Sequence, residues 1–179
     1  RSQSELLHWV DHHAWDRLLN RVPSVEGQFV YIPGATLHAL GAGNLIYEIS
    51  ERPDITYRLY DYDRVDANTG LPRELHRQEA MALIVAPESY RPSLTPIPDT
   101  SRNPTVVLER PEKFGLALVR SAAHVSLPTW GFLTIVEGEG TLSSMPVTQG
   151  DTILVDQQSL QCTCSGKWQG LFAYLPEGK

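Results

Sequence analysis

The stretch GQFVYIPGATLHALGAGNLIYEIS, residues 27–50, decides the fold. An apolar run over 29–32 is followed by the turn signal Pro33-Gly34 and then by His38. Short apolar runs that are divided by such dipeptides are typical of strands joined by turns. We therefore expect a short strand, a turn and a second strand that starts at His38.

The imidazole of His38 has two readings. In a small all-β barrel, a histidine at a strand start can face the mouth of the barrel, where a neutral ring nitrogen serves as a metal ligand. A single histidine in a strand can equally be a hydrogen-bonded structural residue. The residue alone leaves both readings open.

Composition excludes several classes of protein. The 179 residues carry a net charge of −6 without a long basic run, so nucleic acid and membranes are not expected partners. The 13 prolines and 13 glycines favour a β-rich fold with many turns over a helix bundle. Cys162 and Cys164 stand two apart on an alternating pattern, a poor spacing for a disulfide, and we expect them to be free and partly buried.

The segments that carry a family resemblance lie around and beyond His38. Four positions follow the second metal-binding motif of the cupins: Gly27, Pro33, His38 and Asn44. The continuation ITYRLYDYDR, residues 55–64, followed by LPRELH, residues 71–76, closely resembles the short bacterial type of class I mannose-6-phosphate isomerases. The pattern expects a glycine at Ala35 and the chain has it one residue earlier, so the turn geometry should differ there.

The resemblance implies a zinc-dependent isomerase that interconverts mannose 6-phosphate and fructose 6-phosphate through a cis-enediol. His38 matches the last zinc-binding histidine of the family, and Arg58 matches an arginine that stabilises the enediolate or its proton transfer. Arg64 matches a basic residue that binds the substrate phosphate. Glu48 matches an active-site glutamate, with a role as general acid or base or in orienting a water.

Each of these side chains has a structural alternative. Arg58 could pair with Asp54 or Asp61 on a strand, and Arg64 could pair with Asp61 or Asp66 at a surface turn. Glu48 lies in an apolar run over 44–49 that is expected to be a strand with its carboxylate inward, and it could form a structural ion pair there.

The zinc site is incomplete in this sequence. Family sites also use a Gln-x-His pair and a glutamate upstream of the last histidine, and no such segment precedes His38. Three protein ligands are usual for a catalytic zinc. We therefore expect the C-terminal portion of an isomerase, with the remaining ligands on the missing upstream segment, which would be a partner of this chain; a homo-oligomer is the other partner considered.

Three regions are expected along the chain. Residues 1–86 should be the remainder of a catalytic cupin jelly-roll barrel, with a helix in the first twenty residues capped by Ser4 and another over 73–85. Residues 87–104 read as a proline-rich connection. Residues 105–179 should form a second, smaller and degenerate cupin-like barrel.

Short strands and glycine-bearing turns fill the last region. The turns are expected at 137–140 and 149–151. Metal ligands are absent from its cupin positions, so we expect a structural barrel that covers the first barrel or contacts another subunit, and His124 should lie in a loop or an edge strand. The expected strands are 105–108, 115–121, 132–136, 140–143, 152–155, 159–163 and 170–174.

Two functions follow from these patterns. The first is the cytoplasmic mannose-6-phosphate isomerase that the resemblance implies, acting on a small sugar phosphate. The second is a non-catalytic cupin-like sugar-binding or regulatory module, which would keep the pocket and Arg64 without aldose-ketose exchange. An interaction piece that forms a subunit interface is a further alternative.

Overall fold

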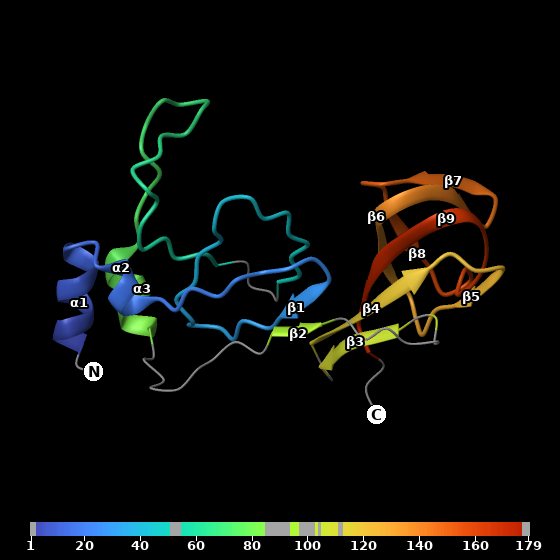
Figure 1. Cartoon of the computed structure of the whole chain (residues 1–179), viewed down its shortest axis with the longest axis horizontal. Helices are drawn as coiled ribbons and strands as arrows, with labels where there is room; N and C mark the ends of the chain where they lie inside the picture. Colours follow the sequence, from blue (N-terminus) through green and yellow to red (C-terminus); the bar gives the residue numbers. More distant parts are fainter. Residues whose placement is uncertain are drawn as a thin grey trace. The chain divides into compact units, whose positions relative to one another are not determined.

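The computed structural model describes residues 3–50, 55–84, 94–96, 103, 105–110 and 113–176. The chain divides into two compact units, residues 1–95 and 96–179. Both are shown in Figure 1. None of the helices in the described part has the length and apolar character that crossing a membrane requires.

Three short helices form the core of the N-terminal unit: α1 (Gln3–Asp11), α2 (Trp15–Leu18) and α3 (Arg77–Leu83). The buried residues of this core are Val10 in α1, Ala80 and Met81 in α3, and Leu59, which lies outside the helices. The expected N-terminal helix is broken where His13 takes a left-handed φ of 51°, and Ser4 lies inside α1, so the prediction of an N-cap there was wrong. The second expected helix starts only at Arg77, because the backbone N–H of His76 donates to the Arg58 carbonyl and the backbone of His76 is not helical.

The sheet of this unit is small. Strand β1 (Gln28–Val30) pairs with β2 (Leu94–Pro96), which lies within the expected proline-rich connection. The prediction of a strand over 44–49 was wrong, since residues 31–50 contain neither helix nor strand. An extended segment becomes a strand only when a neighbour accepts its backbone hydrogen bonds, and none of the described residues does so here. Leu45 is accordingly 97% exposed.

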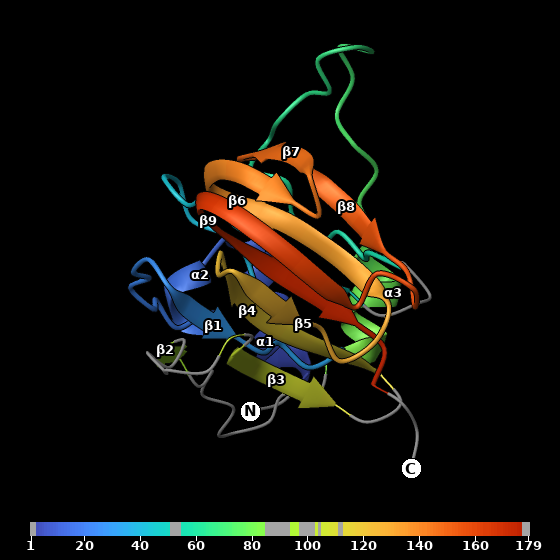
Figure 2. The ribbon, with the colours of Figure 1, turned by 90° about the vertical axis from the view of Figure 1, so that its right-hand side faces the viewer.

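The C-terminal unit is an antiparallel β structure. Its strands are β3 (Thr105–Arg110), β4 (Phe114–Arg120), β5 (His124–Ser126), β6 (Gly131–Leu142), β7 (Met145–Thr148), β8 (Thr152–Val155) and β9 (Gln161–Tyr174). The order is β3-β4-β9-β6-β7, with β8 paired to β6 and β5 paired to β9. Figure 2 shows β6 and β9 as the two long neighbouring ribbons.

Alternation along these strands builds the core of the unit. Gly131, Leu133 and Ile135 of β6 are buried, whereas Phe132 between them is 48% exposed. The largest fully enclosed side chains of the whole described chain belong to this core: Phe172, Leu133, Ile135, Val119, Val125 and Val155. The expectation of a mainly β fold with a few helices is confirmed.

One predicted strand break proved to be continuous. The glycine-rich stretch 137–140, expected to be a turn, continues β6 and pairs with β9, and a bulge just before it shifts the register between Ile135 and Glu137. Gly138 has a φ of 80°, and a Cβ at this position would lie 2.1 Å from the carbonyl oxygen of Lys167. The bulge absorbs one extra residue, so that the strand runs on instead of turning.

His124 lies in the edge strand β5, and Cys162 and Cys164 are free, as expected. Cys162 is buried and Cys164 is half-buried. Burial raises the pKa of both thiols. The thiolate forms are therefore disfavoured.

Replacing Gly138 with alanine should destabilise the C-terminal unit by more than about 2 kcal/mol, because the left-handed backbone and the close Lys167 carbonyl both oppose a Cβ. The measurement is chemical denaturation. Glu139→Ala, a change at the adjacent exposed residue of the same strand, is the matched control and should have little effect. Equal stability of the two variants would contradict this account of Gly138.

Ala35 takes a left-handed φ of 62°, at the position where the cupin pattern places glycine. Ala35→Gly should therefore raise the free energy of unfolding by roughly 0.5 to 1 kcal/mol, as the cost of a left-handed alanine exceeds the added entropy of the unfolded chain. Gly34→Ala is the control: a Cβ there meets no atom within 4 Å and φ is not left-handed, so stability should change little. A loss of stability in Ala35→Gly would refute the explanation.

Candidate functional site

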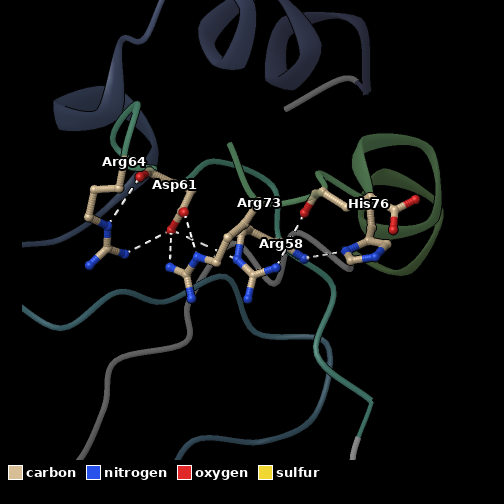
Figure 3. A network of polar contacts seen from close by, with 6 residues as sticks. Arg58, Asp61, Arg64, Arg73 and His76 are labelled. Carbon is tan, nitrogen blue, oxygen red and sulfur yellow. Dashed lines mark hydrogen bonds and ion pairs between the residues drawn. The ribbon is translucent and has the colours of Figure 1, made fainter. Parts of the chain in front are cut away.

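A buried carboxylate surrounded by arginines is the main polar cluster of the N-terminal unit. Asp61 is 6% exposed. Its Oδ1 accepts a hydrogen bond from Nη2 of Arg64 at 2.8 Å, and its Oδ2 accepts one from Nε of Arg73 at 2.7 Å. Nη2 of Arg73 also contacts Oδ1, so Arg73 binds the carboxylate through two nitrogens. Figure 3 shows this network.

Arg58, three residues before Asp61 in the chain, completes the cluster. Its Nε lies 3.8 Å from Oδ1 of Asp61, and its Nη1 donates to the carbonyl of Glu74 at 3.3 Å. Its backbone N–H donates to Nδ1 of His76 at 3.2 Å, and the backbone N–H of His76 donates to the Arg58 carbonyl at 2.8 Å. The LPRELH segment thus fixes Arg58 through both its backbone and its side chain.

A strained turn brings Arg64 back over Asp61. Tyr62 and Asp63 both have φ of 55°, in the left-handed region that non-glycine residues rarely adopt. The turn is closed by the backbone N–H of Arg64, which donates to the Asp61 carbonyl at 3.1 Å. The guanidinium of Arg64 also lies 5.4 Å from the centre of the Tyr62 ring, a cation–π distance. Strain of this kind persists only where surrounding contacts hold it.

The charges at the cluster do not balance. Hydrogen bonds from Arg73 and then Arg64 outweigh burial and lower the pKa of Asp61 from its ordinary value of 3.8 to about 2. The same contact raises the pKa of Arg73. The Asp61 carboxylate thus faces three guanidinium groups, those of Arg58, Arg64 and Arg73, and Asp66 is the second negative charge that acts on Arg73. The excess positive charge makes the cluster attractive to anions.

The structure brings together two of the four predicted site residues. Arg58 and Arg64 share Asp61, as one of the alternatives for each anticipated; the other partner considered for Arg58, Asp54, lies outside the described residues. His38 and Glu48 are exposed and lie in no strand, so the prediction that a strand carries each of them was wrong. Nδ1 of His38 lies 2.9 Å from the carbonyl oxygen of Thr36.

The described residues do not fit a zinc ion. Among them, no group of three or more histidine, cysteine, aspartate or glutamate side chains is placed to hold a metal. His38 can offer Nε2, but one imidazole does not make a stable zinc site. The chemistry of the cluster around Asp61 is that of an anion site.

Sequence reasoning did not single out Arg73, and it considered Asp61 only as a structural partner. The signal for Arg73 lay in the LPRELH segment, which carries a second arginine twelve residues from Asp61. An isolated bridge between Val65 and Pro72 closes the polar turn and returns the chain to the cluster. Contacts of that separation are not readable from local patterns.

A small cavity lies beside the cluster. It has a volume of about 90 Å³. Its wall includes a stack of the Trp15 and Tyr60 rings, whose centroids are 5.0 Å apart. The lining residues are Val10, His13, Trp15, Leu59, Tyr60, Asp63, Leu75 and Arg77. Ligand pockets are usually several times larger, so this cavity is too small to serve as one.

Comparison with known proteins places this geometry in a family. Mannose-6-phosphate isomerase ManA of Bacillus subtilis is 33% identical over 172 residues, covering 86% of this chain and 51% of ManA. The crystal structure of the mannose 6-phosphate isomerase from Bacillus subtilis superposes with a TM-score of 0.77 and 27% identity, over 98% of this chain and 58% of that one. The chain belongs to the bacterial class I mannose-6-phosphate isomerase family.

A second relative and a search of family models complete the comparison. The mannose-6-phosphate isomerase of Streptococcus mutans is 38% identical over 84 residues, covering 47% of this chain and 26% of that protein. No protein-family model matches the chain. The chain spans about half the length of the mannose-6-phosphate isomerases that it matches, and its fold is that of the cupin-type structure of the family.

The low pKa of Asp61 predicts an acid-sensitive N-terminal unit. A carboxyl whose pKa is depressed on folding contributes stability that is complete above its unfolded pKa and is lost as the pH falls through the folded value. The contribution should therefore disappear between about pH 4 and pH 2. Thermal denaturation across this range should show the stability difference between the wild type and Asp61→Asn shrinking as the pH falls.

Asp16→Asn is the matched control, because Asp16 pairs with Arg21 at 2.8 Å with both side chains largely exposed. Surface pairs of this kind contribute little. The control should follow the wild type at every pH. A wild-type advantage over Asp61→Asn that persists undiminished at pH 2 would contradict the assignment.

Proposed function

We propose that this chain is the arginine-bearing part of an aldose-ketose isomerase that interconverts mannose 6-phosphate and fructose 6-phosphate in the cytoplasm. The observation that carries the proposal is that Arg58 and Arg64, both from the family motif, converge on one buried carboxylate. An excess of fixed positive charge is what a phosphorylated sugar and an enediolate intermediate both require.

Arg58 stabilises the negative charge that develops during the reaction. The proton moves between C1 and C2 through a cis-enediol, and charge accumulates on the oxygens of those carbons. A guanidinium remains protonated and offers a rigid fork of donors to two adjacent oxygens. Arg58 is suited to this role because Glu74 and His76 hold it in place before the substrate arrives.

Arg64 binds the phosphate group of the substrate. Its side chain is 60% exposed while its inner edge is held by Asp61, so it can meet a ligand from the solvent side. Glu48 is proposed to carry the proton between the two carbons. Its carboxylate is exposed in this chain, and the role requires that another segment enclose it.

Zinc enters the proposal only through His38. The described residues supply no further group of ligands, so the remaining ligands have to come from another polypeptide segment. We propose that these ligands come from the half of the family sequence that this chain does not match, and not from a second copy of the chain. The stretch over 31–50, which contains neither helix nor strand, offers such a partner exposed apolar side chains, including Leu40, Leu45 and Ile46.

The test of the proposal is reconstitution. The chain is mixed with the unmatched half of Bacillus subtilis ManA in the presence of Zn²⁺, and the conversion of fructose 6-phosphate to mannose 6-phosphate is measured. We expect isomerase activity and stoichiometric zinc in the mixture, and neither in the chain alone. A folded complex that lacks activity would overturn the isomerase proposal.

Within the active mixture, Arg58→Gln should lower kcat by about 10²- to 10³-fold, the usual effect of removing one donor to a developing oxyanion. Arg21→Gln, in the exposed pair with Asp16, is the control and should leave kcat unchanged. Binding of the sugar phosphate without exchange, in wild type and variants alike, would instead favour the sugar-binding or regulatory module.

A further inference from the structure

We propose that Arg73 is a second phosphate ligand beside Arg64, and that Asp61 is the positioning residue that fixes the two guanidinium groups relative to each other. This inference rests on the proposed function and specifies its phosphate subsite. Neither Arg73 nor Asp61 has a role assigned by the family motif. Their contacts with each other and with Arg64 carry the assignment.

The donors of the two arginines are divided between an inner and an outer edge. Arg64 and Arg73 each direct Nε and Nη2 at Asp61, through its side chain or its carbonyl. A guanidinium carries five N–H donors. Among the described residues, no hydrogen bond occupies Nη1 of Arg64 or Arg73. The outer edges of both groups therefore remain available to a ligand.

The exposure of these side chains separates the ligand side from the structural side. The Arg64 and Arg73 side chains are 60% and 40% exposed, whereas the Asp61 side chain between them is 7% exposed. In Figure 3 the guanidinium groups of Arg58, Arg64 and Arg73 lie on one side of the Asp61 carboxylate. An incoming anion would thus meet the guanidinium groups before it approaches the carboxylate.

The chemistry favours a phosphate monoester as the ligand. Asp61 and Asp66 do not neutralise all three guanidinium groups, and the remaining positive charge favours an anion. Two planar guanidinium groups suit the tetrahedral array of phosphate oxygens through several charge-assisted hydrogen bonds. Arg58 directs Nη1 at the Glu74 carbonyl and its side chain is 25% exposed, so Arg64 and Arg73 are the more accessible pair.

The experiment measures binding of inorganic phosphate to the whole chain, without zinc and without turnover. Isothermal titration at low ionic strength, checked by ³¹P NMR, should show saturable binding to the wild type. Arg73→Lys keeps the positive charge but removes the planar guanidinium with its paired donors. We expect this variant to bind phosphate at least tenfold more weakly than the wild type. Arg21→Lys, a matched change in an exposed ion pair of the same unit, should bind as the wild type does.

Asp61→Asn separates positioning from simple neutralisation. If Asp61 only cancels positive charge, its removal should tighten phosphate binding; if it positions Arg64 and Arg73, binding should weaken several-fold despite the added net charge. Thermal denaturation confirms that the variant is folded, and Arg73→Lys serves as the deciding variant should Asp61→Asn fail to fold.

Absence of phosphate binding by the wild type, wild-type affinity in Arg73→Lys, or tighter binding in Asp61→Asn would each overturn the inference. The outcome is distinct from that of the isomerase proposal. Phosphate binding that depends on Arg73, in a complex without isomerase activity, would refute the enzyme and leave the anion site standing. Isomerase activity combined with unchanged phosphate affinity in Arg73→Lys would support the enzyme and refute the role of Arg73 in the anion site.

Discussion

The N-terminal unit depends on one desolvated carboxylate. Asp61 is withdrawn from water, and such a charge is tolerated only when its oxygens are fully hydrogen-bonded. Arg64, on the strained turn after Asp61, and Arg73, on the returning segment, meet this requirement with hydrogen bonds, and Arg58, just before Asp61 in the chain, adds an ion pair. The need to satisfy one anion thus places three cations, and their surplus charge is what the unit offers to a ligand.

Local patterns were sufficient for most of the C-terminal unit. Its alternating apolar residues predicted strand 152–155 with its observed bounds, and most of the other strands in approximate position. The length of β6 was missed because a glycine pair reads as a turn in sequence. Whether the chain reverses at Gly138 or continues as a strand is decided by the neighbouring strand, whose Lys167 carbonyl lies against it. That contact is not local.

In the candidate site, too, local sequence patterns identified some residues, while contacts between distant residues were missed. The motif around Arg58 and Arg64 identified two members of the cluster, because both residues stand in a distinctive stretch. Arg73 was missed, since its approach to Asp61 requires the loop between them to close. The strand expected around Glu48 failed for a related reason: apolar residues favour extension, but pairing needs a partner strand that the described residues do not provide.

The closed loop between Arg64 and Arg73 has a consequence for engineering. Val65 and Pro72 form a bridge at its base, and Asp66 accepts hydrogen bonds from the backbone of Asn68 and Thr69 within it. The separation of the two arginines is therefore set at the base of the loop and not by its tip. The tip around Asn68 offers an insertion point where a fluorophore or an affinity tag could report on the guanidinium pair without displacing it.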